Sequence, residues 1–251
     1  MSPARQYSAP SALANPVFPV PDSAANARLH DVLRRIAAAA TSAGRPCPRL
    51  LAVSKMQPVQ ALADLAGAGQ LAFGENYVQE AAGKRQALDP AVDAALEWHL
   101  IGHLQSNKAA LAAQVFDWVH SVDRPGLAKA LADRRDPAAA PLNVLLQVNV
   151  ESEAGKGGCR PDQVQELAAH VAAQPALALR GLMAIPVPHP DPEQRRPAFR
   201  MMRQLFDTLA ARHAGMDTLS MGMSDDFAVA IAEGATLVRI GTALFGPRPP
   251  R

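Results

Sequence analysis

Short apolar runs alternate with amphipathic stretches along this chain from residue 22 onward. Residues 49–54 are apolar at nearly every position, whereas residues 22–44 place four apolar side chains on one helical face, Leu29, Val32, Leu33 and Ile36. Runs of the first kind predict eight strands, at residues 49–54, 71–76, 97–102, 118–123, 142–150, 179–185, 218–223 and 236–241. Helical patterns lie between them, at residues 58–69, 77–88, 106–116, 124–135, 160–174, 196–214 and 224–234. Short strands that are apolar on both faces indicate a parallel sheet covered on both sides.

Eight such units in roughly 200 residues predict an α/β fold, a TIM (β/α)8 barrel that forms a single domain over residues 22–251. Residues 242–251 are too short for a full last helix, so the extra N-terminal helix at residues 22–44 is expected to fill that gap. An open doubly wound sheet is the alternative, but no GxGxxG motif marks its ligand crevice. Residues 1–21, rich in Pro, Ser and Ala, predict a poorly ordered leader.

Composition and net charge limit the classes of protein to which this chain can belong. A net charge of +2, without a basic stripe and interleaved aromatics, gives no indication of nucleic-acid binding. No apolar run is long enough to span a bilayer and no signal-like segment opens the chain, so we expect no membrane partner and a cytoplasmic location. Two cysteines, Cys47 and Cys159, do not make a disulfide framework and favour a reducing compartment.

Polar residues at two neighbouring strand ends point to an anion site. Functional groups of a TIM barrel lie at the carboxyl ends of its strands. The seventh expected strand runs into Ser224, with Asp225 and Asp226 in the first turn of the following helix, and the eighth is followed by Gly241 and Thr242. Helix N-termini favour phosphate. Alternatively, Ser224 only caps a helix and Gly241 only makes a turn. The two motifs together favour phosphate.

The first expected strand ends in Ser54 and Lys55. A lone lysine after a strand is usually solvated. Here it would lie at the barrel mouth near Arg239, where desolvation and a nearby cation both favour the neutral amine. A neutral amine that faces a phosphate site is what a Schiff base with pyridoxal phosphate (PLP) requires.

Other reactive side chains carry weaker signals. His99, His103 and His120 lack the spacing of a metal-binding motif and no cysteine or carboxylate set accompanies them, so no metal is expected. Cys159 has no identifiable base partner, which argues against a nucleophilic thiol.

Six stretches carry a family resemblance: LLAVSKMQP, FGENYVQE, WHLIGHLQSNK, VHSVD, GLMAIP and LSMGMSDDFAVAIAEGATLVRIGTALFG. Between residues 50 and 246 they resemble, in the same order, the pyridoxal phosphate homeostasis proteins (the YggS/PROSC family). The resemblance implies a barrel of PLP fold type III, like the N-terminal domain of bacterial alanine racemase. The leader lies outside it.

The resemblance also implies roles for individual residues. Lys55 would hold PLP as a Schiff base, Arg239 would face the pyridine nitrogen, and Asn76 would lie beside the ring. The remaining implied cofactor contacts are Met223, Ser224, Gly241 and Thr242, with His99 and Met183 as further pocket lining. His103 and the loop at residues 151–160 receive no role.

The family is one that binds PLP and manages its supply, without established turnover, and PLP-dependent apoenzymes would be the recipients. An arginine at the pyridine nitrogen makes the cofactor a weaker electron sink. An amino-acid racemase is the first alternative. It needs a second base, which would be Tyr77 or a histidine, since the only other tyrosine is Tyr7. The second alternative is a barrel that binds another phosphorylated metabolite. Without the second domain of the racemase, a monomer is expected.

Overall fold

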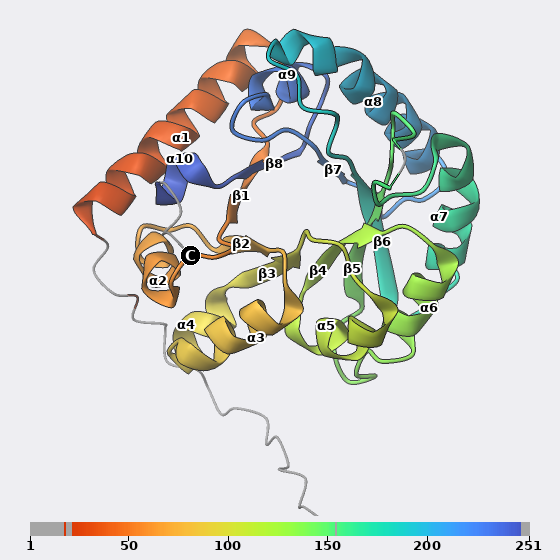
Figure 1. Cartoon of the computed structure of the whole chain (residues 1–251), viewed down its shortest axis with the longest axis horizontal. Helices are drawn as coiled ribbons and strands as arrows, with labels where there is room; N and C mark the ends of the chain where they lie inside the picture. The colour runs from red at the N-terminus through yellow and green to blue at the C-terminus, as the bar shows by residue number, and fades with distance from the viewer. Residues whose placement is uncertain (1–17, 19–21, 154, 247–251) are drawn as a thin grey trace, which may run out of the picture.

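Eight parallel strands form a closed barrel in the computed structural model, which describes residues 18, 22–153 and 155–246 (Figure 1). Each strand pairs with the next along the chain, and β8 pairs with β1. The strands are β1 Arg49–Val53, β2 Ala72–Glu75, β3 Glu97–Leu100, β4 Trp118–Val122, β5 Leu142–Gln147, β6 Leu177–Met183, β7 Thr218–Ser220 and β8 Leu237–Ile240. The predicted TIM barrel is therefore confirmed.

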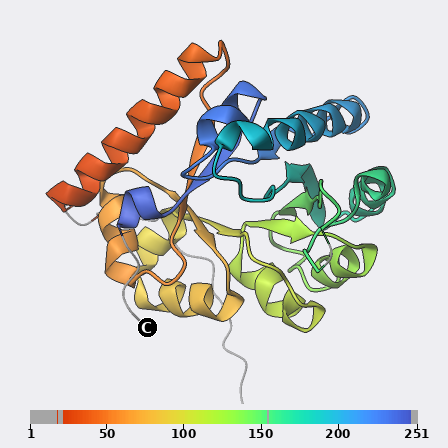
Figure 2. The same cartoon turned by 45° about the horizontal axis from the view of Figure 1, so that its top comes forward.

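Helices surround the barrel on the outside (Figures 1 and 2). They are α1 Ser23–Ser42, α2 Val59–Gly67, α3 Val78–Ala87, α4 Pro90–Ala95, α5 Ala109–Val115, α6 Pro125–Ala132, α7 Val164–Ala172, α8 Arg196–Ala210, α9 Phe227–Ala232 and α10 Thr242–Phe245. Three 3₁₀ turns, η1 Ser106–Lys108, η2 Pro161–Gln163 and η3 Pro192–Arg195, precede α5, α7 and α8.

The extra N-terminal helix takes the place of a full helix after β8. Leu29, Val32 and Ile36 of α1 are buried as predicted, whereas Leu33 is 42% exposed, so its place on the apolar face was predicted wrongly. Helix α1 packs against α9 and the four-residue α10. The Arg28 Nε–H donates a hydrogen bond to Leu244 O at 2.7 Å, which ties α1 to α10. Most of the predicted leader lies outside the described residues; Phe18 packs against the main hydrophobic cluster.

Side chains of the strands alternate between two apolar environments. Leu50 and Ala52 belong to the main cluster between the barrel and its helices, whereas Leu51 belongs to a separate small cluster. Because successive side chains of a strand point to opposite faces, the small clusters fill the barrel interior. They consist of Leu51, Ala72 and Leu237, and of Trp118, Leu145 and Met183.

Helix α4 is an element that the hydrophobic pattern did not predict. The Asp89 carboxylate accepts a hydrogen bond from the Ala91 N–H at 2.8 Å, and Pro90 occupies the first helical position. An acidic N-cap followed by proline is a common helix start. The signal was therefore present in the sequence, but the helix is only six residues long.

Candidate cofactor-binding site

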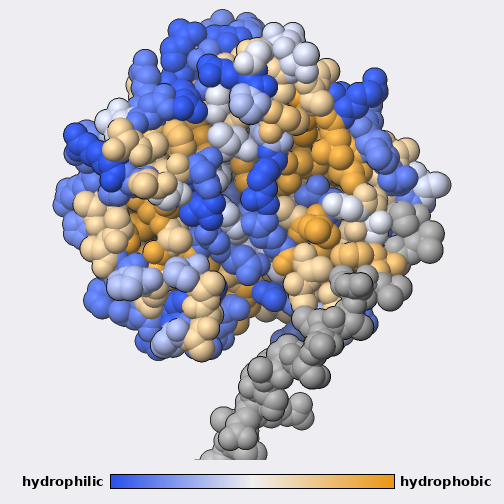
Figure 3. All heavy atoms as spheres, turned by 180° about the vertical axis from the view of Figure 1, so that it is seen from behind, coloured by the Kyte–Doolittle hydropathy of each residue, from blue (hydrophilic) through white to orange (hydrophobic). Residues whose placement is uncertain are grey.

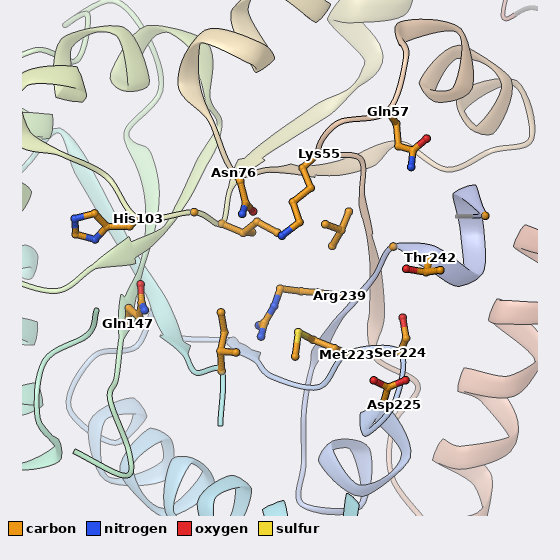
Figure 4. A pocket seen from close by; sticks show the side chains of 16 residues that line it. Lys55, Gln57, Asn76, His103, Gln147, Met223, Ser224, Asp225, Arg239 and Thr242 are labelled. Atoms are coloured by element: carbon orange, nitrogen blue, oxygen red, sulfur yellow. The ribbon is translucent and has the colours of Figure 1, made fainter. Parts of the chain in front are cut away.

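A cavity of about 570 Å³ opens at the carboxyl ends of the strands, a volume typical of small-molecule sites. Lys55 and Arg239 extend into its middle, and Ser224 and Thr242 lie together on one side (Figure 4). Seven of the nine residues predicted as cofactor contacts line it: Lys55, Asn76, Met223, Ser224, Arg239, Gly241 and Thr242. The barrel thus brings together residues that are far apart in the sequence.

The other two predicted residues lie deeper in the barrel. Met183 is fully buried and packs with Ile185, which does line the cavity. His99 is also fully buried, within the barrel interior. Their contact with a cofactor stays a prediction.

Several lining residues received no role from the sequence. They are Gln57, Ile101, His103, Gln147, Ile185 and Asp225. For most of them, the sequence signal that could have identified them as lining residues is a position just beyond the end of a predicted strand. Nearby, a Cβ atom on Gly102 would lie 2.2 Å from Asn76 O, so glycine is what allows the chain after β3 to pass behind Asn76.

Arg239 is a buried cation at the base of the cavity, with only 3% of its surface exposed. Its Nη1 donates to Ser220 Oγ at 2.6 Å and its Nη2 donates to Ala184 O at 2.8 Å. Burial lowers the pKa of Arg239 to about 10, against the opposing effect of the Asp226 charge. The guanidinium therefore stays charged at neutral pH and presents only hydrogen-bond donors.

A hydrogen-bonded chain continues from Arg239 through the barrel interior. Ser220 Oγ lies 3.3 Å from His120 Nδ1, and His120 Nε2 lies 2.9 Å from His99 Nδ1. Ser220 Oγ accepts from Arg239, which can only donate, and the Glu97 carboxylate at the other end of the chain favours the proton of His99 on Nε2. With that tautomer, His99 Nδ1 accepts from His120 Nε2, and His120 Nδ1 accepts the hydrogen of Ser220 Oγ. These tautomers are assigned from the network.

The chain ends near a carboxylate at the start of β3. His99 Nε2 lies 3.4 Å from Glu97 Oε1, in the range of an ion-pair contact but without hydrogen-bond geometry. Every hydrogen in the chain therefore points away from the Arg239 cation toward the Glu97 anion. One chain of oriented polar contacts therefore links the cavity to the opposite end of the barrel.

The two buried histidines predict an acid-sensitive fold. Burial lowers the pKa of His120 well below its usual 6.5, and burial also lowers that of His99 despite the opposing Glu97. The unfolded chain takes up protons below pH 6.5 that the folded protein does not, so stability falls as the pH falls. The free energy of unfolding should drop by up to about 1.4 kcal/mol per pH unit for each histidine. Urea unfolding at pH 7.5 and 5.5 measures this slope.

The matched variants are His120→Gln and, for an exposed histidine, His30→Gln. His120→Gln should flatten the acid slope, whereas His30→Gln should keep it. An unchanged slope in His120→Gln would contradict the assignment of this histidine as buried and neutral.

The turn after β7 differs from its prediction. Helix α9 begins at Phe227, so Asp225 and Asp226 do not lie in the first turn of a helix, and that prediction is wrong. Instead, Asp226 Oδ1 accepts a hydrogen bond from the Met223 N–H at 2.6 Å and fixes the turn that carries Ser224. A short polar side chain that bonds a nearby backbone N–H offers an alternative to helix.

Other candidate chemistry is limited in the part of the chain that the structure describes. No three His, Cys, Asp or Glu side chains there are grouped to hold a metal ion. Burial raises the pKa of Cys159 to about 12, so its thiol is a poor nucleophile. No helix within residues 18, 22–153 and 155–246 is long and apolar enough to cross a membrane.

A second cavity, of about 340 Å³, lies at the opposite end of the barrel, where the strands begin. Four arginines line it, and three of them, Arg49, Arg180 and Arg203, are ion-paired with Glu97, Asp217 and Asp207. The fourth, Arg45, donates to Ala232 O. The protein itself neutralises most of these charges, so the first cavity remains the stronger candidate for an anionic ligand.

Fold and site together define a parallel (β/α)8 barrel that presents a lysine after β1 and an arginine from β8 to one cavity. A family model for the N-terminal domain of alanine racemase matches residues 28–249. The chain is 49% identical over 222 residues to the pyridoxal phosphate homeostasis protein of Escherichia coli, covering 88% of this chain and 95% of that protein. Identity to the protein of the same name from Pseudomonas aeruginosa is 51% over 219 residues, covering 86% and 93%.

A solved structure of PipY from Synechococcus elongatus, with PLP bound, is also similar. The TM-score is 0.77 and the identity 34%, covering 88% of this chain and 100% of that chain. The chain belongs to the alanine racemase N-terminal domain family and, within it, to the pyridoxal phosphate homeostasis proteins. The resemblance found in the sequence motifs is confirmed.

Proposed function

We propose that this protein binds PLP in the cavity at the carboxyl ends of the strands and serves its homeostasis, holding the cofactor on Lys55. The observation that carries the proposal is the shared cavity. It combines an amine, a buried guanidinium and two hydroxyl groups from three neighbouring strand ends, β7, β8 and β1. Similarity to proteins named for PLP homeostasis supports the same function.

The donor set suits the phosphate group of PLP. Ser224 and Thr242 offer hydroxyl groups on one side of the cavity (Figure 4). The N–H groups of Thr242 and Ala243 begin α10, and the first N–H groups of a helix have no acceptor within it. A Cβ atom on Gly241 would lie 3.3 Å from Val53 O, so glycine keeps this rim narrow and exposes its backbone.

Lys55 and Arg239 serve two further polar groups of the cofactor, its aldehyde and its pyridine nitrogen. The PLP aldehyde condenses with a neutral amine, with loss of one water, and this reversible bond is the chemistry that it supplies. Lys55 provides the amine. Arg239, which can only donate, holds the pyridine nitrogen unprotonated, and Asn76 lies at the edge of the same cavity.

We propose a carrier rather than a racemase. Racemisation requires a second base on the far side of the substrate. Tyr77 is 57% exposed and is not among the cavity-lining residues, and Tyr7 lies outside the described residues. His103 does line the cavity, and it is the histidine that the assay below has to exclude as a second base. PLP-dependent apoenzymes are the proposed recipients. A deuterium wash-in assay on alanine and other amino acids tests this choice, since exchange with turnover would favour the racemase.

A cytoplasmic monomer fits this role. The large apolar side chains that are exposed in the described residues, Leu33, Leu71, Tyr77 and Met201, belong to separate segments. The face seen from behind likewise shows separate hydrophobic patches around a hydrophilic middle (Figure 3). Scattered apolar residues of this kind are normal for a monomer.

The visible spectrum of the purified protein tests the proposal. A yellow protein, or one that turns yellow when PLP is added, supports it. A colourless protein that takes up no added PLP would instead favour another phosphorylated metabolite as the ligand.

Removing one hydroxyl from the proposed phosphate site should weaken PLP binding. Ser224→Ala and Thr242→Val each remove one hydrogen bond to a charged group, which should cost roughly 1.5–3 kcal/mol, about ten- to a hundredfold in affinity. Colour should still develop at high PLP concentration, because Lys55 is intact. Equilibrium titration measures the dissociation constant, and Thr208→Val, on the exposed face of α8, is the control. Unchanged affinity in both variants would place the phosphate elsewhere.

A further inference from the structure

Lys55 lies in a tight turn with an unusual backbone conformation. The Gln57 N–H donates to Ser54 O at 3.0 Å, which closes the turn around Lys55 and Met56. Met56 has φ of +62°, in the left-handed region that residues with side chains seldom adopt. Such a turn persists only where surrounding contacts determine it.

Two side chains hold the peptide groups on either side of Lys55. Lys84 Nζ donates to Ser54 O at 2.7 Å, and the Met56 N–H donates to Glu80 Oε1 at 2.5 Å. These atoms belong to the two planar peptide groups that meet at the Lys55 Cα. Because rotation at that Cα changes only the relation between the two planes, holding both of them fixes the direction in which the Lys55 Cα–Cβ bond leaves the backbone.

Both contacts come from one buried ionic cluster on β2 and α3. Lys84 Nζ also donates to Glu75 Oε1 at 2.6 Å and to Glu80 Oε1 at 2.7 Å. All three ammonium hydrogens therefore have acceptors. Ser54 Oγ donates to Glu75 Oε1 at 2.7 Å, which adds a second bond to the residue before Lys55.

The burial of this cluster argues for a role beyond stability. The Lys84 and Glu75 side chains are 8% and 0% exposed, and burial raises the pKa of Glu75 against the charge of Lys84. Glu75 Oε2 is buried and has no hydrogen-bond partner among the described residues. Buried ion pairs are often no more stable than apolar residues of similar volume. We propose that Lys84, Glu75 and Glu80 are positioning residues that direct the Lys55 amine into the cavity.

This inference rests on the proposed function, in which Lys55 bonds PLP. Glu80→Ala tests it with the least risk to folding, because the Glu80 side chain is 24% exposed and Lys84 keeps Glu75 as a partner. Gln79→Ala, an exposed change one residue away on α3, is the matched control. Glu80→Gln is the conservative variant, because its amide oxygen can still accept the Met56 N–H.

Two measurements separate positioning from stability. At saturating PLP, Glu80→Ala should slow the appearance of the yellow colour at least tenfold, with the melting temperature close to that of the wild type. In the protein without PLP, NMR should show at least tenfold faster hydrogen exchange at the Met56 amide. Glu80→Gln should restore much of the wild-type rate of colour formation and much of the wild-type protection of the Met56 amide. Gln79→Ala should change neither quantity.

A wild-type rate together with unchanged Met56 exchange in Glu80→Ala would overturn the inference. Wild-type protein that never takes up PLP would defeat the proposed function instead. In that case, hydrogen exchange at the Met56 amide is the measurement that tests the positioning role. Faster exchange in Glu80→Ala supports that role, and unchanged exchange rejects it.

Discussion

The Lys55→Ala protein should lose covalently bound PLP completely and remain colourless at PLP concentrations that turn the wild type yellow. Lys55 lines the cavity, and the nearby Lys84 is buried, with its Nζ bonded to Ser54 O, Glu75 and Glu80. Contacts with the phosphate survive the substitution, so weak binding remains. Loss of the covalent bond should lower affinity by more than about tenfold, or about 1.4 kcal/mol.

Borohydride reduction followed by peptide mass spectrometry measures this result. In the wild type, the reduced cofactor should be found on the peptide that contains Lys55. Lys129→Ala is the matched control, because Lys129 is an exposed lysine on α6 that pairs only with Asp133 in the described residues. Equal labelling in Lys55→Ala, on another lysine, would show that the assignment of the covalent site is wrong.

Replacing Asp226 with alanine should cost about 3–5 kcal/mol of stability. Asp226 Oδ2 lies 2.5 Å from Arg195 Nη1, and the two side chains are 1% and 8% exposed. The substitution leaves a buried guanidinium without its anion. It also removes the acceptor of the Met223 N–H and so loosens the turn that carries Ser224.

Urea unfolding of Asp226→Ala and Asp225→Ala measures the difference. Asp225 is adjacent but exposed, so its replacement should change stability by no more than about 0.5 kcal/mol. Adding Arg195→Met to Asp226→Ala should recover part of the loss, because the buried charge is then gone. Equal stability of the two single variants would contradict the buried ion pair.

The barrel could be predicted from sequence because its strands carry a distinctive pattern. Runs such as residues 49–54 are apolar on both faces, and in a closed barrel one face meets the helices while the other meets the interior. Convergence of Lys55, Ser224 and Thr242 followed from the fold, since all parallel strands end at one face. The start of α4 was missed because six residues are too few for a helical period.

The polar contacts inside the barrel could not be predicted from the sequence. The resemblance implied that His99 lines the pocket, but His99 bonds His120 inside the barrel. Glu75 falls within the expected strand at residues 71–76, and its pairing with Lys84 depends on how α3 packs over β2. Hydrophobic periodicity specifies which face a residue occupies, but not which polar partner meets it across the fold.

The position of α1 has a consequence for protein synthesis. This helix emerges from the ribosome early and is soon followed by its neighbour α2, yet its other packing partners α9 and α10 are almost the last elements to be made. Part of its buried stripe, which includes Leu29, Val32 and Ile36, therefore lacks its final partners until then. Strand β1 likewise pairs with β8 only at the end. Ring closure therefore comes after translation of nearly the whole chain, and apolar surface of the first helix is exposed during synthesis.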